Sequence, residues 1–273
     1  MAASLPKPVR TMLFALRFCR GKLQLPKKRD SIRHPSGMAC RGSNTRGFRG
    51  RAHLKDWTLA AALNNARWCD AVCRAHGHAG RFLPHMWVNA ATVPRFYPNA
   101  VTLAVGDTAL EEQLTTVEIL QKSNLPGRWS VKDSFGTLDL SRRGFELLFD
   151  AKWIRGGMPA EGPSTDIVWQ REDSGAEGLP VDEPGFAMFK GRRGFKVVAG
   201  FMLYRAEDVV GVSNVVAEAA DAPAVWRSLS LLAAQTFPRL PLVGYESGDE
   251  LQAAVTSGFE AGDELRVWVT ARD

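Results

Sequence analysis

The chain has 273 residues, 45% hydrophobic and 23% charged, an ordinary globular balance with enough length for one large core or two smaller ones. Its net charge of +6 is uneven: residues 1–55 carry 14 lysines and arginines against one acid, Asp30, whereas the remainder carries 21 basic and 28 acidic side chains. An acidic main part argues against a nucleic-acid-binding domain, four cysteines argue against a disulfide framework, and no apolar run approaches the roughly 20 residues of a membrane span.

Residues 1–55 are predicted to be a disordered basic extension, because like charges without apolar clusters cannot offset the entropy of ordering. Three interpretations stay open. The segment is rich in arginine and poor in acids, as in an organelle transit peptide. It could also be an arm that weakly contacts nucleic acid or an anionic membrane. Alternatively, translation begins at Met38 or later, and much of the segment is not in the mature protein.

The first predicted element of the main part is an amphipathic helix at 56–77 that ends at a glycine. Cys69 and Cys73 lie four residues apart on it, and His76 and His78 follow. A metal site needs about four ligands at tight spacing. Two small apolar side chains packed on one helix face explain the pattern more simply, so we expect no metal.

The sequence then repeats itself. Segments 98–154 and 213–269 share an order of elements: a short apolar strand, an amphipathic helix, a second strand, and a Gly-Phe pair that opens a last strand. Identical residues recur at offsets of 114 or 115, namely Asn99 with Asn214, Phe145 with Phe259, and Trp153 with Trp268. The pattern favours an internal duplication over two unrelated α/β segments.

In the first segment we expect a helix at 107–122, a strand at 129–135, and a left-handed glycine at Gly144. Residues 156–184 are rich in glycine, proline and acids, which predicts a linker with one short strand at 167–169.

Residues 185–216 are predicted to form an antiparallel meander with turns at 191–194 and 205–208, followed by a helix at 223–236. The chain is therefore expected to divide into four parts: the extension at 1–55, an N-terminal half at 56–155, the linker at 156–184 and a C-terminal half at 185–273.

The run from "KVVAGFMLYRAEDVVGVSNVVAEAADAPAVWRSL" to "LPLVGYESGDELQAAVTSGFEAGDELRVWV" resembles the second half of a GCN5-related N-acetyltransferase (GNAT) domain. The resemblance covers 185–271 well and 85–154 through the repeat. It implies an α/β (α+β) fold, with a GNAT-like mixed sheet flanked by helices and built of two pseudo-repeated halves. It also implies a cytoplasmic protein of a bacterial kind.

The resemblance implies acetyl-CoA as the co-substrate, held between the central strand and a splayed neighbour. The central strand would be 212–216, the phosphate turn 217–222, and the helix behind it would begin at Pro223, where its N-terminus favours an anion. The implied cofactor-binding residues are Val215, Val216, Ala217, Ala220, Asp221, Ala222 and Ala224.

Two features depart from the family pattern. The phosphate turn reads "AEAADA" without glycine, and Glu218 and Asp221 place negative charge where a pyrophosphate would lie. The helix before the second Gly-Phe pair has Ala254 where the family often places a proton-donating tyrosine. The first departure weighs against tight cofactor binding, and the second means that the usual acid of the reaction is missing.

The catalytic candidates follow the strand ends. Glu218 and Glu246 are candidate bases for the amine, and Tyr245 is the nearest candidate acid. Candidate substrate-orienting residues are Ser213, Asn214, Asn99 and Asp133.

Each candidate also has a structural explanation. The two glutamates could be solvated acids at strand ends, and the two asparagines could satisfy nearby backbone groups. For Asp133 a plain ion pair with its neighbour Lys132 is favoured over a substrate contact.

Two functions from different classes remain. The first is a GNAT-like acyltransferase that moves an acyl (acetyl) group from acyl-CoA to an amine of a small molecule or a protein. The alternative is a catalytically degenerate GNAT-fold module that binds a ligand or a protein. We expect no membrane partner, and no nucleic-acid contact beyond a weak one through the basic extension.

Overall fold

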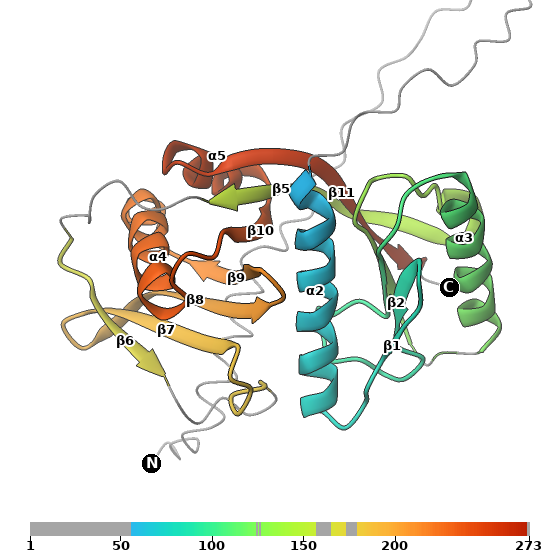
Figure 1. Ribbon diagram of the computed structural model, residues 1–273, viewed down its shortest axis with the longest axis horizontal. Coiled ribbons are helices and arrows are strands. Elements are labelled where there is room, and N and C mark those ends of the chain that lie inside the picture. Colours follow the sequence, from blue (N-terminus) through green and yellow to red (C-terminus); the bar gives the residue numbers. More distant parts are fainter. Residues whose placement is uncertain (1–55, 124, 126, 157–164, 173–178, 272–273) are drawn as a thin grey trace, which may run out of the picture.

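The computed structural model describes residues 56–123, 125, 127–156, 165–172 and 179–271. The expected disorder of 1–55 lies outside the described residues, as do residues 157–164 and 173–178 of the predicted linker. The described chain forms one mixed sheet of 11 strands in the order β1-β2-β3-β4-β11-β5-β10-β9-β8-β7-β6, flanked by helices (Figure 1). None of the described helices is both long and apolar enough to cross a membrane.

The N-terminal half contributes α2 (Asp56–Ala75), β1 (Arg81–Phe82), β2 (Met86–Val88), β3 (Ala100–Thr102), α3 (Asp107–Lys122), β4 (Ser130–Asp133), the 3-10 turn η1 (Ser141–Arg143) and β5 (Phe145–Gly156). The rest of the chain contributes β6 (Val168–Glu172), β7 (Phe186–Arg193), β8 (Lys196–Ala206), β9 (Val209–Val216), α4 (Ala222–Thr236), β10 (Leu242–Glu246), α5 (Gly248–Thr256) and β11 (Glu260–Thr270).

The last strands of the two halves lie side by side in the middle of the sheet. β5 pairs antiparallel with β10 of the other half, and β11 pairs antiparallel with β4 of the first half. The ladder between them runs from Phe145↔Thr270 to Arg155↔Glu260, so each strand begins where the other ends. Each half therefore supplies its final strand to the other. The internal duplication stays a prediction.

The Gly-Phe pairs open these two strands as the sequence indicates. Gly144 and Gly258 have φ of 77° and 96°, a left-handed conformation that costs glycine little. Phe145 and Phe259, which follow them, are both buried, so each pair turns the chain and anchors it in the core.

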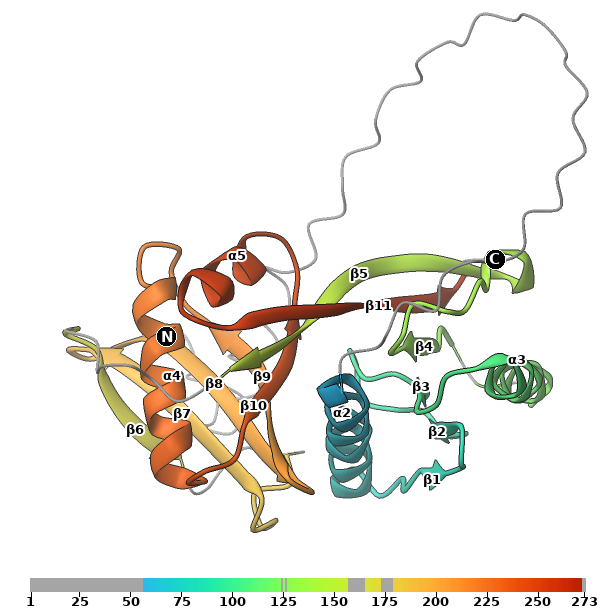
Figure 2. The ribbon, with the colours of Figure 1, turned by 45° about the horizontal axis from the view of Figure 1, so that its top comes forward.

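The alternation of side chains along the strands shows which face of the sheet each helix covers. In β10, Leu242 packs in the cluster that contains α4 and α5, whereas Val243 packs in the cluster that contains α2. In β3, Ala100 packs with α3 and Val101 packs with α2. Because neighbouring residues of a strand point to opposite faces, α2 covers one face and α3, α4 and α5 cover the other (Figure 2).

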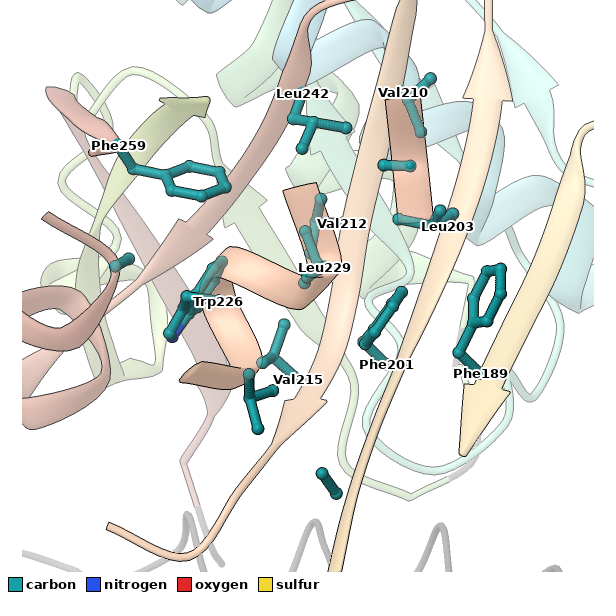
Figure 3. Close-up of a cluster of buried hydrophobic side chains, with 14 of the residues drawn as sticks. Phe189, Phe201, Leu203, Val210, Val212, Val215, Trp226, Leu229, Leu242 and Phe259 are labelled. Carbon is teal, nitrogen blue, oxygen red and sulfur yellow. The ribbon is translucent and has the colours of Figure 1, made fainter. Parts of the chain in front are cut away.

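The core of the C-terminal half shows why α4 is fixed behind the sheet. Trp226 and Leu229 of α4 pack against strand residues that include Val212 and Leu242 (Figure 3). The Trp226 ring meets Phe259 edge to face at 4.9 Å between centroids. Burying side chains of this size contributes about 1.5–3 kcal/mol each, so these contacts hold α4 firmly against the sheet.

Most expected elements are confirmed, with shifts at their ends. The helix expected at 107–122 has these bounds in α3, and a strand forms within the predicted linker as β6. β7 runs through Arg193, so the first meander turn falls at Gly194 and the residue after it, later than expected. The second turn falls between β8 and β9, within 205–208 as expected.

Candidate functional site between β9 and β10

Two neighbouring parallel strands of the C-terminal half separate partway along their length. β9 and β10 pair only at Val210↔Leu242 and Gly211↔Val243. Farther along, β9 stays paired with β8 and β10 stays paired with β5. In this part of the described chain, the β9 backbone from Ser213 onward has no strand partner on its β10 side, which leaves hydrogen-bonding groups for a ligand.

Asn214 lies in a β-bulge beside this separation. Its φ is 51°, and the β8 ladder shifts between Met202↔Ser213 and Gly200↔Val216. Asparagine tolerates this left-handed conformation better than most residues, and its amide donates to Met202 Sδ at 3.3 Å. Bulges turn backbone groups and side chains to new directions, frequently next to functional sites.

The residues expected to hold the cofactor follow one continuous path from this bulge. Val215 and Val216 end β9, Ala217 and Ala220 lie in the loop, Asp221 is the N-cap of α4, and Ala222 and Ala224 lie in the first helical turn. Pro223 occupies the first turn, as expected. The path ends at a helix N-terminus, which favours an anion, but it contains no glycine to let the backbone approach one closely.

The two acids of this loop are paired with cations of the β7–β8 hairpin. Arg193 donates to Asp221 at 3.0 and 3.2 Å, and also to both oxygens of Asp166. Lys196 donates to Glu218 at 2.8 Å. The sequence suggested unopposed carboxylates. Because each acid has a cation, the loop repels an anion less than two bare charges would.

Asp221 occupies the N-cap position without making a side-chain cap bond, because its oxygens face Arg193. Hydrogen bonds to Asp166 and Asp221 raise the pKa of Arg193, and the hydrogen bond from Arg193 lowers the pKa of Asp166. The hairpin cations are therefore engaged by protein carboxylates as long as those carboxylates stay ionised.

Tyr245 lies at the centre of a polar cluster on the α2 face. Lys132 of β4 donates to Tyr245 Oη at 3.0 Å and to Asn65 Oδ1 of α2 at 2.8 Å. The same ammonium lies 4.2 Å from the centre of the Tyr245 ring. Trp153 of β5 packs edge to face on that ring at 5.7 Å between centroids. The cluster therefore combines residues from both halves of the chain.

The structure brings Ser213 and Tyr245 to the two sides of the separation. If the register of Gly211↔Val243 continued, Ser213 would lie opposite Tyr245. Side chains alternate between the two faces along a strand, and Val209 of β9 and Val243 of β10 both lie on the α2 face. Ser213 is four residues after Val209 and Tyr245 is two after Val243, so both also lie on the α2 face. The two residues therefore lie on the two strands that separate, and the Tyr245 phenol is directed toward Lys132 of β4.

The two candidate bases do not join this group. Glu246 is buried at the end of β10, and alternation turns it to the face opposite Tyr245. Glu218 is exposed in the loop beside Lys196. Ala254, at the position where the family often has a proton-donating tyrosine, is fully buried in the core cluster that includes α4.

The two candidate substrate residues of the N-terminal half, Asn99 and Asp133, form hydrogen bonds within the protein. The amide of Asn99 is buried and donates to the carbonyls of Asn89 and Ala91. Asp133 is also buried and accepts backbone N–H groups of Phe135 and Leu138, and burial raises its pKa. The favoured Lys132–Asp133 ion pair is wrong, because neighbouring strand residues point to opposite faces.

The paired cysteines pack as small apolar residues. Cys69 and Cys73 lie in a buried cluster with Trp87 and Val101. Burial raises the pKa of Cys69 to about 11 and that of Cys73 to about 12. Within the described ranges, no three His, Cys, Asp or Glu side chains gather as metal ligands.

Sequence reasoning missed Asn65, Arg193 and Lys196. Asn65 carries no signal beyond its place in an amphipathic helix. A lysine inside the apolar strand "WSVKDSF" did mark Lys132, but its partners lie 67 and 113 residues away. The contact with Tyr245 also depends on the exchange of strands between the halves.

No family model matches the sequence, and no curated protein matches it. Among solved structures, a GCN5-related N-acetyltransferase from Kribbella flavida matches with a TM-score of 0.53 at 12% identity, over 78% of this chain and 96% of that one.

Weaker matches include a functionally unknown conserved protein from Staphylococcus epidermidis, with a TM-score of 0.48, 10% identity, and coverage of 72% of this chain and 91% of that one. A GCN5-related N-acetyltransferase-like protein from Streptococcus suis matches with a TM-score of 0.46 and 10% identity, over 79% and 100%. On the Kribbella flavida match and the strand arrangement described above, the chain has a GCN5-related N-acetyltransferase (GNAT) fold.

Proposed function

We propose that the chain binds acyl-CoA between β9 and β10 and transfers its acyl group to an amine. The observation that supports this most is the separation of the two strands after Gly211↔Val243, beside the bulge at Asn214. The unpaired β9 backbone suits the amide groups of a pantetheine arm, and the path continues to the N-terminus of α4, which suits a phosphate.

The proposed reaction is aminolysis of a thioester. The amine nitrogen attacks the acyl carbon, the C–S bond breaks, and the leaving thiolate takes a proton. Tyr245 is the proposed proton donor, since its own O–H remains available while Lys132 donates to its oxygen. Ser213 on the opposite strand would help to orient the acyl carbonyl, and an ordered water would accept the proton of the amine.

We expect the wild type to bind acetyl-CoA weakly, because the loop lacks glycine and its acids occupy the hairpin cations. The double change Glu218→Gln, Asp221→Asn should strengthen binding about tenfold or more, which corresponds to about 1.4 kcal/mol. It removes two negative charges and frees Lys196 and part of Arg193 for the pyrophosphate, while asparagine remains a good N-cap residue.

Calorimetric titration of acetyl-CoA into the full-length protein tests this proposal. The matched control is Asp107→Asn, Glu111→Gln, which removes two exposed acids from α3 in the other half and should leave affinity unchanged. Tight binding by the wild type would instead mean that the loop acids do not limit the site.

A second function is favoured by the same loop. The absence of glycine at 217–222, together with the carboxylates already paired with Arg193 and Lys196, fits a module that no longer uses CoA. The absence of binding in both the wild type and the double variant would select this alternative.

A further inference from the structure

Lys132 is a buried cation with only neutral partners. Its side chain belongs to a residue that is 4% exposed, and its ammonium donates to the amide of Asn65 and the phenol of Tyr245. Among the residues that the structure describes, it forms no ion pair. Buried charges in proteins are ordinarily paired, because an unpaired one loses its hydration without compensation.

The groups near Lys132 do not supply a negative charge to balance its ammonium. Asp133, the next residue, has its carboxylate on backbone N–H groups. The Cys69 thiol near Lys132 stays protonated at neutral pH, since burial raises its pKa to about 11. An ammonium has three hydrogen atoms to donate, and the two hydrogen bonds described leave one of them available.

The ammonium lies close to the surface at the proposed acyl-transfer site. Asn65 and Tyr245, the two hydrogen-bond partners of Lys132, are both partly exposed. Tyr245 is also the residue whose register position faces Ser213 across the separated strands. An anionic group bound to Lys132 would therefore lie on the α2 face, beside Tyr245 and Asn65.

We infer that Lys132, Asn65 and Tyr245 form the subsite for a substrate carboxylate, so that the amine to be acylated belongs to an amino-acid-like molecule. The inference rests on the proposed acyl transfer for the role of the amine, but the carboxylate site itself does not need CoA. Lys132 supplies the charge, and Tyr245 and the Asn65 amide flank it.

The test uses the full-length protein without CoA. N-acetylated amino acids, which have the form of reaction products, are titrated by ligand-observed NMR, each against its own C-terminal amide. The wild type should bind at least one carboxylate about tenfold or more tightly than the matching amide, since a hydrogen bond to a charged group is worth that ratio. Equal affinity for every carboxylate and its amide would overturn the inference.

Two variants assign the effect to Lys132. Lys132→Met removes the charge at similar length, and Asn65→Asp places a protein carboxylate within about hydrogen-bond distance of the ammonium. Both should abolish the discrimination, and Asn65→Asp should also raise the melting temperature. The control Lys122→Met removes an exposed charge from α3 and should change neither. Discrimination that survives in folded Lys132→Met or Asn65→Asp would overturn the assignment.

Acetyl-CoA titration of Lys132→Met separates this inference from the proposed function. Its CoA affinity should equal that of the wild type, because the cofactor path runs through β9 and the loop. Carboxylate discrimination without any CoA binding, in the wild type and in the Glu218→Gln, Asp221→Asn variant alike, would keep this subsite and reject acyl transfer. CoA binding without carboxylate discrimination would reject the subsite alone.

Discussion

Single residues with unusual surroundings mark the candidate site. Asn214 has a left-handed backbone in the middle of a strand, and Lys132 is buried without an ion pair to any residue that the structure describes. Sequence reasoning singled out Asn214 by its recurrence at the position of Asn99, yet the two asparagines have different surroundings: Asn99 satisfies local carbonyls, whereas Asn214 forms a bulge. Residue identity alone could not reveal this, because backbone conformation at a bulge depends on the register of the neighbouring strand.

The bulge residue should be sensitive to side-chain branching. Asn214→Val should lower the free energy of unfolding by about 1–3 kcal/mol, because a β-branched residue at φ of 51° is strained. Asn214→Gly, which tolerates this conformation, should cost clearly less. Urea denaturation of both variants measures the difference, and equal stability would mean that the bulge relaxes at no cost.

The buried thiols predict a dependence of stability on pH. Their folded-state pKa values of about 11 and 12 lie above the ordinary value of 9.0, so the folded protein keeps protons that the unfolded chain releases. Stability from this source is complete below about pH 9 and falls as the pH rises toward the folded values. Cys69→Ala should flatten this fall between pH 8 and pH 10.5 in urea titrations. An unchanged slope would contradict the burial of this thiol.

At the scale of elements, helices were the most predictable part of the fold. Apolar periodicity located α3 at its observed bounds and α4 within one residue, because a helix is specified by local spacing. The short strands and the first hairpin turn were less certain, since pairing and turn positions depend on partners elsewhere in the chain. The Arg193–Asp221 contact also depends on distant parts of the chain, because it joins the β7–β8 hairpin to the N-cap of α4.

One buried amide of α2 binds the backbone of β8 and β9. Asn64 Nδ2 donates to the carbonyls of Tyr204 and Val209, and a methyl group on Gly211 would lie 2.0 Å from Asn64 Oδ1. Asn64→Ala should therefore cost about 1–3 kcal/mol of stability, because it leaves buried carbonyls unsatisfied. The exposed neighbour Arg67, changed to alanine, should cost less than about 1 kcal/mol. Thermal and urea unfolding compare the two, and equal costs would show that this amide does not anchor α2.

At the scale of the whole molecule, the two halves share one sheet through the exchange of β5 and β11. No local sequence pattern specifies this exchange, because the sequence of each strand would show the same pattern if the strand paired within its own half. The same exchange brings Lys132 of β4 and Tyr245 of β10 to one cluster. The candidate site was therefore only partly predictable: its cofactor path is local in sequence, whereas its polar cluster is not.

The exchange predicts that the halves fold together. Residues 185–273 alone lack β5, which lies between β10 and β11 in the sheet, so they should show no cooperative unfolding transition. Co-expression with residues 56–184 should restore a single transition seen by circular dichroism. A cooperative transition of the isolated C-terminal half at the melting temperature of the full chain would contradict the shared sheet.

The most direct measurement of the central claim is amide hydrogen exchange with and without millimolar acetyl-CoA, on the wild type and on the Glu218→Gln, Asp221→Asn variant. The account predicts slower exchange for residues 213–222, more strongly in the variant, and no change for residues 100–106 of the other half. Unchanged exchange at 213–222 in both proteins, or protection confined to another part of the chain, would contradict an acyl-CoA site between β9 and β10.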